Sequence, residues 1–515
     1  ILAQARSTIE RPRPTAAHPL AMLSMRSAST AVLSAANGAA SARARGSLAR
    51  ALASGPAQDD VVVVGAGVVG VCTARALAQR GYRVRVLERR PGAGEGSSYI
   101  NGTLICPSLM LPWTGPQMIP KLVKSFFNAK HPLKVHPHAL ADLSLWYFGL
   151  HYAVSCRPGQ STANTGHLAR LAAYSRACLG RLMDEEPRIG QLMQQTAKGT
   201  LQVFDSSDAL KACMEASEQI RAAGVPLTAM SPEDCSAGGD GFVESLRAQG
   251  KEALYLFSEL DTNGDCHKLT RHLASACGDM GVTFEYDCAV RGFRRDGDRW
   301  HVALEDGREL GAGRVVLCGG TESPKIARAL GLRLPMYPVK GYAVTVPLLP
   351  GAQQLQSNVV QDSKKLYLAP LGPDHVRITG CAEFSGGDAS VDEARAKILL
   401  EQACALMPGQ LDVAKATYYA GLRPLSADDV PILGAAGRGI YLNTGHGSKG
   451  WTHAFGSAEL VADLLAGSKT EIDPAPYDLA RFWPLRQKLS RQLELAKLIP
   501  NPSRVSLTQG ALSLA

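Results

Sequence analysis

The stretch Val61–Glu88, VVVVGAGVVGVCTARALAQRGYRVRVLE, decides the fold of this chain. It opens with four consecutive valines, and an uninterrupted β-branched run is typical of a strand buried on both faces in a parallel sheet. Three glycines follow, and the spacing of apolar residues from Val68 to Arg80 predicts a helix. Residues 82–88 then alternate as a second strand that ends in an acid. The sequence therefore predicts a strand–turn–helix–strand unit.

The three glycines have separate tasks in such a unit. Gly65 permits the tight turn, Gly67 lets the backbone approach a pyrophosphate, and Gly70 lets helix and strand pack closely. Free N–H groups at the helix start then face the phosphates, and Glu88 is placed to accept hydrogen bonds from ribose hydroxyls. The unit predicts a dinucleotide site formed by Gly65, Ala66, Gly67, Val68, Val69, Gly70, Glu88 and Arg89. The acid would repel a 2′-phosphate, which argues against NADP. A glycine-rich turn that serves packing alone is the alternative.

Length and composition indicate a globular protein with a large core. At 515 residues the chain exceeds one ordinary domain. Its contents of 45% hydrophobic and 20% charged residues are typical of such proteins. The only long apolar window, Val61–Ala78, is interrupted by three glycines and contains Arg75, so we do not interpret it as a membrane span.

The net charge of +9 comes mainly from one end of the chain. Residues 1–57 hold seven Arg and one acid, Glu10, so they carry +6 and leave +3 for the rest. This segment is rich in Ala and Ser, a composition that predicts an organelle transit peptide, with the mitochondrion favoured over the chloroplast. A disordered tail without a targeting role is the alternative. We expect no nucleic-acid partner, because no basic stripe with interleaved aromatic residues is present.

Cysteine and histidine spacing gives no support for a metal site. The twelve Cys include no C-x-x-C pair, and the twelve His include no H-x-x-x-H pair. Isolated Cys in a long chain fit a reducing compartment.

Five further stretches resemble one family of flavoenzymes. They are ERRPGAGEGSSYINGTLICP (Glu88–Pro107), GRVVLCGGTESPKI (Gly313–Ile326), YPVKGYAVTVP (Tyr337–Pro347), YYAGLRPLSADDVPILG (Tyr418–Gly434) and IYLNTGHGSKGWTHAFGSAELVADLL (Ile440–Leu465). They are similar to segments of FAD-dependent D-amino acid dehydrogenases, within the D-amino acid oxidase superfamily. The resemblance runs from about Val61 to about Gly467, and the last two stretches together are the most specific.

The resemblance implies FAD as the cofactor. No Cys or His stands in a recognisable attachment context, so we expect FAD to be held without a covalent bond. The resemblance places the pyrophosphate and ribityl chain against Ser97, Ser98, Asn101 and Gly102, the adenine near Val290, and the flavin near Gly319, Gly320, Gly445, His446, Gly447, Ser448 and Gly450. The residues themselves agree at the last group, because Thr444–Gly450 precedes a helical pattern at Trp451–Leu465. The positive end of that helix could stabilise a reduced flavin.

The expected fold is α/β, with a glutathione-reductase-type FAD-binding domain interleaved with an antiparallel-sheet substrate domain. We expect the FAD-binding domain to comprise 58–110, 260–335 and 426–475, and the substrate domain 111–259 and 336–425. The alternating patterns in the second of these ranges predict strands. Thr283–Phe293 reads as one short strand, preceded by a helix that Asn263 or Asp265 caps. Residues 476–515 read as a peripheral helical extension.

The resemblance implies oxidation of D-amino acids to 2-oxo acids and ammonia. Arg423 matches the family's carboxylate-binding Arg, and an Arg fork suits a bidentate carboxylate. Tyr342 and Tyr255 are further candidates to bind the carboxylate or position the amine. Lys449 departs from the dehydrogenase pattern and resembles a carboxylate-binding Lys of sarcosine-oxidase-like relatives.

Two other functions stay open at this point. One is a related flavoenzyme acting on sarcosine, dimethylglycine or proline, which Lys449 favours. The other is a flavin-binding respiratory-complex assembly factor without turnover. The expected electron acceptor is a quinone or another carrier, although the sequence leaves an oxidase open. The Lys-rich and aromatic segment 109–157 predicts either a contact with an anionic membrane surface or an ordinary helix packed over the core.

Overall fold

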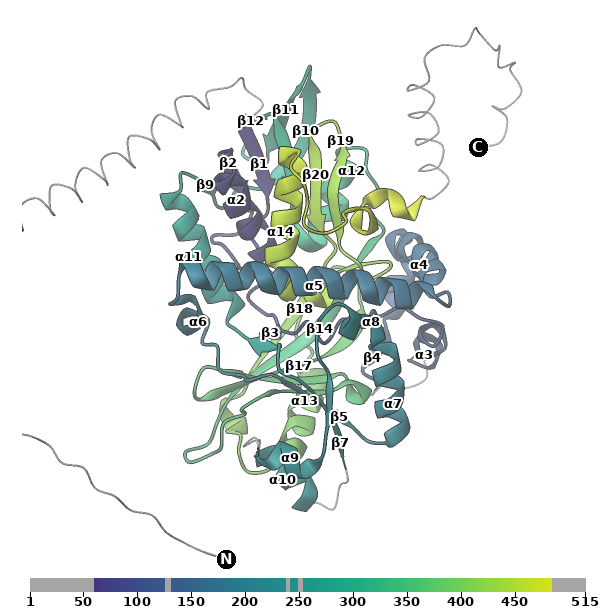
Figure 1. Ribbon diagram of the computed structural model, residues 1–515. Helices are drawn as coiled ribbons and strands as arrows, with labels where there is room; N and C mark the ends of the chain where they lie inside the picture. The colour runs from purple at the N-terminus through teal and green to yellow at the C-terminus, as the bar shows by residue number, and fades with distance from the viewer. Residues whose placement is uncertain (1–59, 126–130, 238–240, 249–252, 484–515) are drawn as a thin grey trace, which may run out of the picture. The chain divides into compact units, whose positions relative to one another are not determined.

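The computed structural model describes residues 60–125, 131–237, 241–248 and 253–483 (Figure 1). The segment 1–57, for which the sequence predicts a transit peptide, lies outside the described residues. So does the part of the C-terminal extension beyond 483.

The glycine-rich unit forms the centre of a six-stranded sheet. The strand order is β19 (Ile432–Gly437), β20 (Ile440–Thr444), β13 (Arg314–Leu317), β1 (Asp60–Val64), β2 (Arg83–Leu87) and β9 (Thr283–Glu285). All neighbours are parallel except β19 and β20. The valines of β1 are buried, as expected for a strand covered on both faces.

Three helices cover one face of this sheet. The helix α2 (Val68–Gln79) follows the glycine turn and packs against α14 (Gly450–Ala466), which in turn packs against α5 (Gln160–Glu185). Figure 1 shows α5 crossing α14 at the level where the sheet ends. The crossing is close: a Cβ on Gly456 would lie 2.7 Å from the Cα of Ser175. The helices and β1 share one hydrophobic core.

A second, larger sheet forms the other layer. Its order is β18 (Thr417–Ser426), β14 (Met336–Pro347), β17 (His375–Phe384), β16 (Leu366–Leu371), β15 (Asn358–Gln361), β5 (Thr200–Phe204), β7 (Leu254–Ser258) and β6 (Thr228–Met230), and β4 (Leu133–Val135) also pairs with β17. Most of its pairs are antiparallel; β15–β5 and β17–β4 are parallel. The alternating stretches of 336–425 are therefore strands, as predicted. Its own core lies under α13 (Glu393–Leu406).

Two small sheets complete the strands. Residues 283–293 are not one strand, as the sequence predicts, but two: β9 ends at Glu285, and β10 (Val290–Asp296) belongs to an antiparallel sheet with β11 (Arg299–Leu304) and β12 (Glu309–Ala312). The break contains Asp287, whose φ is +51° and so cannot continue a strand. The strands β3 (Leu104–Ile105) and β8 (Thr262–Asn263) form the other pair.

The remaining helices lie around both main sheets. They are α3 (Met118–Ser125), α4 (Leu143–Ser155), α6 (Ile189–Leu192), α7 (Ser207–Ala216), α8 (Glu218–Ala222), α9 (Pro232–Ala237), α10 (Gly241–Ala248), α11 (Cys266–Asp279) and α12 (Ser323–Arg328). The cap of α11 is Asp265, which accepts from the Lys268 N–H at 2.9 Å. Among the described residues, no helix combines the length and apolar content of a membrane-crossing segment.

Two segments differ from the expected division of the chain. Although α5 falls within 111–259, its buried side chains belong to the core of the six-stranded sheet. The described start of the C-terminal extension is not peripheral either. Tyr477 is buried and donates to the His167 carbonyl at 2.7 Å, and Arg481 pairs with Asp428 at 2.7 Å.

Candidate functional site

The glycines of the turn after β1 differ in whether the packing of the protein requires them. A Cβ on Gly70 would lie 1.9 Å from the Gly65 carbonyl oxygen, and one on Gly65 (φ +106°) would lie 2.6 Å from the Cys318 carbonyl oxygen. Packing therefore requires both of these glycines. The nearest protein atom to a Cβ on Gly67 is the Ser98 Oγ at 3.4 Å, an ordinary contact. Packing does not require a glycine there, so a turn that serves packing alone leaves Gly67 unexplained.

The acid at the end of β2 lies beside this turn. The Glu88 carboxylate accepts from the N–H of Ala66 at 2.7 Å and from the N–H of Arg90 at 2.9 Å. Ser98 reaches the start of α2, where its Oγ accepts from the Val68 N–H at 3.0 Å. Segments 30 residues apart thus converge on the carboxyl end of β1, where α/β sheets bind ligands.

One large cavity begins at this edge and extends between the two main sheets. Its volume is about 1410 Å³. The predicted site residues that line it are Gly65, Gly67, Val68, Val69, Glu88, Arg89, Ser97, Ser98, Asn101, Gly102, Val290, Gly319, Gly320, Tyr342, Arg423, His446, Gly447, Ser448, Lys449 and Gly450. Ala66, Gly70, Gly445 and Tyr255 are not among its lining residues. The structure therefore brings together most of the residues that the sequence singles out.

The cavity suits a dinucleotide such as FAD. It is larger than an ordinary small-molecule pocket, and two buried polar atoms of its lining residues lack hydrogen-bond partners in the described structure. The buried Asn101 Nδ2 has no hydrogen-bond partner within the described structure, and neither has the Asn443 Oδ1. Both residues line the cavity. Buried polar groups usually have a hydrogen-bond partner, so these two atoms are suited to bind a ligand in the cavity. No group of three His, Cys, Asp or Glu in the described ranges could hold a metal ion.

Arg423 lies on β18, in the wall formed by the larger sheet. Its guanidinium donates to the carbonyls of Cys381 at 2.9 Å and Gly380 at 3.4 Å, and no carboxylate pairs with it within the described residues. It occupies the space in which Gly341, on β14, would carry a Cβ, 2.1 Å from Nη1. Surrounding protein lowers the pKa of Arg423, yet the cavity gives a ligand access to it. An enclosed cation without a counter-ion is suited to an anionic ligand.

Sequence reasoning missed the aromatic residues around this arginine. The Trp113 ring lies 5.6 Å from the Arg423 Cζ, and its backbone is held at both sides, by the Asp429 carboxylate at 2.8 Å and the Tyr152 hydroxyl at 2.5 Å. Tyr367 lines the cavity and donates to Asp362 at 3.0 Å. Only the alternation of β16 places Tyr367 on a face, and nothing local indicates which face meets Arg423.

Lys449 is in a different state from Arg423. It is buried, and its Nζ lies 2.5 Å from the Asp429 Oδ2. Asp429 has a φ of +64°. Its other carboxylate oxygen would be only 2.8 Å from a Cβ on Gly447, so a larger residue than glycine would crowd it. Burial raises the pKa of Asp429, although the ion pair with Lys449 opposes that shift. Lys449 is therefore neutralised by its own chain, which does not favour a role in binding a substrate carboxylate.

His446 is a neutral residue at the start of α14. Burial lowers its pKa to about 3, and its Nε2 lies 3.2 Å from the Ser457 Oγ. It is uncharged at neutral pH, in keeping with a contact to the cofactor rather than a role as a base.

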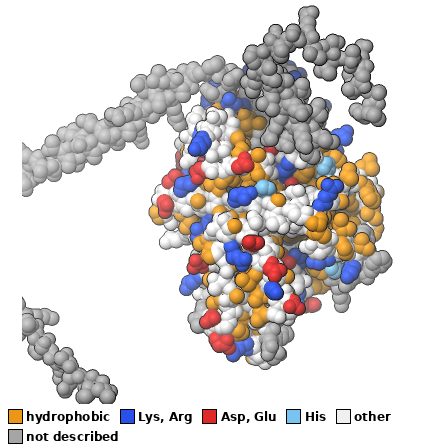
Figure 2. Space-filling view, turned by 45° about the vertical axis from the view of Figure 1, so that its right-hand side comes forward, with side chains coloured by type: hydrophobic (Ala, Val, Ile, Leu, Met, Phe, Trp, Pro, Cys, Tyr) orange, Lys and Arg blue, Asp and Glu red, His pale blue; other side chains and the backbone are white. Residues whose placement is uncertain are grey.

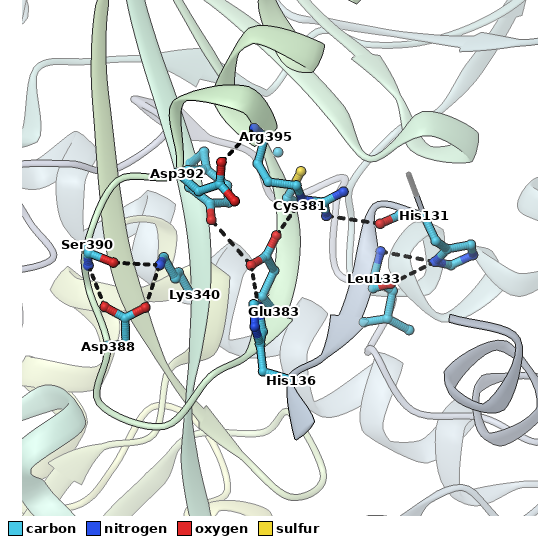
Figure 3. A network of polar contacts seen from close by, with 12 residues as sticks. His131, Leu133, His136, Lys340, Cys381, Glu383, Asp388, Ser390, Asp392 and Arg395 are labelled. Atoms are coloured by element: carbon cyan, nitrogen blue, oxygen red, sulfur yellow. Dashed lines mark hydrogen bonds and ion pairs between the residues drawn. The ribbon is translucent and has the colours of Figure 1, made fainter. Parts of the chain in front are cut away.

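The two tyrosine candidates lie in different places. Tyr342 lines the cavity, but its hydroxyl donates to Glu383 at 3.3 Å. Figure 3 shows Glu383 between His136, at 2.8 Å, and Arg395, at 2.7 Å. The hydroxyl is thus held by a buried polar network and positions the ring at the wall. Tyr255 is a core residue on β7, and the structure does not bring it to the cavity.

A buried carboxylate also escaped sequence reasoning. Asp261 accepts hydrogen bonds from the Ser108 hydroxyl and from the Ser108 N–H at 3.1 Å, and Ser108 lines the cavity. Burial raises the pKa of Asp261 to about 6. No cation pairs with it among the described residues.

Comparison with known proteins places this geometry among flavoenzymes. Residues 60–464 match the family model DAO, described as FAD dependent oxidoreductase. A D-amino acid dehydrogenase of Paramagnetospirillum magneticum is 38% identical over 426 residues, which cover 82% of this chain and 98% of that protein. One from Cereibacter sphaeroides is 36% identical over 424 residues, which cover 82% of this chain and 95% of that protein.

Solved structures share the fold at lower identity. L-proline dehydrogenase from P. horikoshii has a TM-score of 0.63 at 19% identity, and the match covers 82% of this chain and 97% of that one. Glycine oxidase from Geobacillus kaustophilus has a TM-score of 0.61 at 22% identity, covering 82% and 98%. These likenesses concern the fold alone.

Proposed function

Because the chain belongs to the DAO family of FAD dependent oxidoreductases, we propose that it oxidises D-amino acids to 2-oxo acids and ammonia. The family and its flavoenzyme neighbours imply FAD as the cofactor. Relatives named D-amino acid dehydrogenase, which match over 82% of the chain, support the substrate class.

One observation carries this proposal: Arg423 faces the same cavity as the glycine turn and has no carboxylate partner among the described residues. An α-amino acid brings a carboxylate, and a guanidinium can bind it through two parallel hydrogen bonds. Those bonds would fix the orientation of the Cα–H, which is the condition for its transfer.

Other residues that line the cavity are suited to bind the separate parts of FAD. The turn at Gly67 and the side chains of Glu88 and Asn101 would hold the nucleotide and ribityl parts of FAD, and the loop 446–450 would lie beside the flavin. When bound, FAD supplies an acceptor for the two electrons and the hydrogen that leave the substrate Cα. The substrate amine must be uncharged at that stage. The resulting imino acid takes up water and releases ammonia, which leaves the 2-oxo acid.

The pairing of Lys449 with Asp429 bears on the substrate class. A sarcosine-type reading would use Lys449 as the carboxylate ligand, yet its charge is already matched by a buried acid. Binding of a primary D-amino acid through Arg423 does not require a free charge on Lys449. We therefore favour primary D-amino acids over N-methyl or cyclic ones.

The electron acceptor and the location are part of the same proposal. We propose a quinone or another electron carrier as acceptor and the mitochondrion, with the chloroplast as alternative, as the compartment. The Arg-rich, acid-poor composition of 1–57 supports an organelle.

Turnover against a panel of amino acids tests the proposal. The purified protein, loaded with FAD, is assayed with D-, L- and N-methyl amino acids and a soluble redox dye as acceptor. We expect 2-oxo acid and ammonia in equal amounts from D-amino acids only. Preferred turnover of N-methyl or cyclic substrates would contradict the assignment. Bound FAD without turnover of any substrate would instead favour a non-catalytic flavoprotein.

A further inference from the structure

The outer face of α4 exposes a continuous apolar stripe. Leu143 is 82% exposed, Trp146 60%, Leu150 67% and Val154 45%. Their spacing of three and four residues places them on one face of the helix. The opposite face, with Phe148 and Tyr152, packs into a hydrophobic core. Because α4 is apolar on its solvent-facing side as well as on its core-facing side, the solvent-facing side is suited to contact another protein or a membrane.

The stripe has few polar atoms of its own. The only side-chain polar atom of Trp146, Nε1, donates to the Leu140 carbonyl at 2.8 Å, so the exposed surface of the ring is apolar. Leu140 is itself 40% exposed and extends the stripe beyond the start of α4.

The neighbouring helix α3 repeats the pattern on a smaller scale. Ile119 is 42% and Val123 54% exposed, one turn apart, while Met118 and Leu122 pack into the same core that α4 covers. In Figure 2, apolar side chains gather on the right-hand side of the view, the side on which Figure 1 places α3 and α4. We call the outer faces of these two helices the α3–α4 surface.

The sequence segment that contains α3 and α4 carries mainly positive charge. Residues 111–157 contain four Lys and one Arg against a single acid, Asp142. That acid is already engaged, because its carboxylate caps α4 by accepting from the Ser144 N–H at 2.8 Å. Lys124 and Arg157, near the ends of α3 and α4, are exposed. Another cation, Arg328, contacts the Ser144 Oγ at 3.4 Å.

We propose that the α3–α4 surface docks on the anionic face of a lipid bilayer. Leu and Trp side chains enter the boundary between head groups and acyl chains, and flanking cations attract anionic lipids, which is the balance of forces that holds interfacial helices. The positive charge favours this occupant over a second copy of the chain, because pairing two such surfaces would bring like charges together.

The position of α3 connects this surface with the cavity. Met118 and Lys121 line the cavity, while Ile119 and Val123 belong to the α3–α4 surface. A bilayer bound there would lie beside the cavity wall. This deepens the proposed function by naming where a lipid-soluble acceptor would meet the protein, and that part rests on the proposed function. The docking itself does not.

Vesicle binding by the FAD-loaded protein tests the inference. We expect co-sedimentation with phosphatidylcholine vesicles that contain 30 mol% phosphatidylglycerol, the probe in this test. Trp146→Glu/Leu150→Glu should weaken that binding by roughly tenfold or more. Val391→Glu/Val413→Glu, which changes two exposed apolar residues outside the surface (42% and 51% exposed), should bind like wild type. Lys124→Glu/Arg157→Glu should lose the preference for anionic over neutral vesicles.

Several outcomes would overturn the inference. One is wild-type protein that binds neither anionic nor neutral vesicles. Another is an equal loss of binding in Trp146→Glu/Leu150→Glu and in the control Val391→Glu/Val413→Glu. The third is a dimer in light scattering that Trp146→Glu/Leu150→Glu dissociates. The flavin absorption spectrum and dye-linked turnover show whether each variant is folded. If a glutamate pair fails to fold, quenching of wild-type fluorescence by brominated lipids, absent in Trp146→Phe, decides instead. Vesicle binding without dye-linked turnover would refute the proposed function and leave the docking surface intact.

Discussion

At the scale of single residues, two cations in one cavity have opposite states. Lys449 pairs with Asp429 at 2.5 Å, whereas Arg423 donates hydrogen bonds to carbonyl oxygens and pairs with no carboxylate among the described residues. The sequence offers both as carboxylate ligands, and only the three-dimensional arrangement separates them. Asp429 is 20 residues from Lys449, in a turn for which the sequence predicts no role.

Arg423→Lys tests the value of the planar fork. The lysine keeps the charge but cannot form two parallel hydrogen bonds with a carboxylate. We expect kcat/KM for the best D-amino acid to fall by roughly 100-fold, which corresponds to a loss of about 2.7 kcal/mol of transition-state stabilisation. The flavin absorption spectrum should remain unchanged. Unaltered kinetics would remove Arg423 from the substrate site.

Asp261 should make stability depend on pH. Its pKa is about 6 in the folded chain and 3.8 in the unfolded one, so the folded state binds more protons between these values. Stability should therefore fall as the pH rises from 4 to 6, by about 2 kcal/mol from this group. Asp261→Asn lacks this dependence. Denaturant unfolding of both proteins across this range should show the difference in unfolding free energy changing by that amount; a constant difference would be inconsistent with the shift.

At the scale of elements, the sequence predicts those helices, strands and caps that depend on interactions between residues close together in the chain. The β1–α2–β2 unit and α14 follow from β-branched runs and glycine spacing. Capping chemistry predicts Asn263 or Asp265 as the cap of α11, and the structure selects Asp265. The partner of a helix does not follow in this way. The periodicity of α5 shows that one face is buried, but not that it packs on α14. The break between β9 and β10 depends on Asp287, whose left-handed backbone no pattern predicts.

A pair of glycine substitutions separates folding from cofactor binding. Gly70→Ala places a Cβ 1.9 Å from a backbone oxygen and should cost roughly 3 kcal/mol or more of unfolding free energy. Gly67→Ala has room in the protein, so its apoprotein should lose less than about 1 kcal/mol. Its Kd for FAD should nevertheless rise by roughly tenfold or more, because the Cβ meets the pyrophosphate.

Chemical denaturation of the apoproteins and FAD titration measure the two effects. Wild-type FAD affinity in Gly67→Ala would show that the turn does not approach a ligand.

At the scale of the whole molecule, the site lies between two sheets, and the chain segments that form these sheets alternate along the sequence. Cofactor-side and substrate-side residues come from segments as far apart as Gly65 and Arg423, and the cavity that joins them exists only in the folded protein. Many of the residues that line it are ones that the family resemblance singles out, because they lie in its motifs. Trp113, Tyr367 and Asp429 lie outside those roles. Their contribution depends on which strand faces and loops meet, and a single sequence does not specify that.

The most direct test of the central claim is an anaerobic titration of the FAD-loaded protein followed at the flavin absorption band. If the cavity holds FAD and a D-amino acid side by side, with Arg423 on the carboxylate, the D-enantiomer should bleach the flavin without oxygen or dye. The L-enantiomer should leave it oxidised. A flavin that D-amino acids do not reduce, or protein that remains colourless after incubation with FAD, would contradict the account.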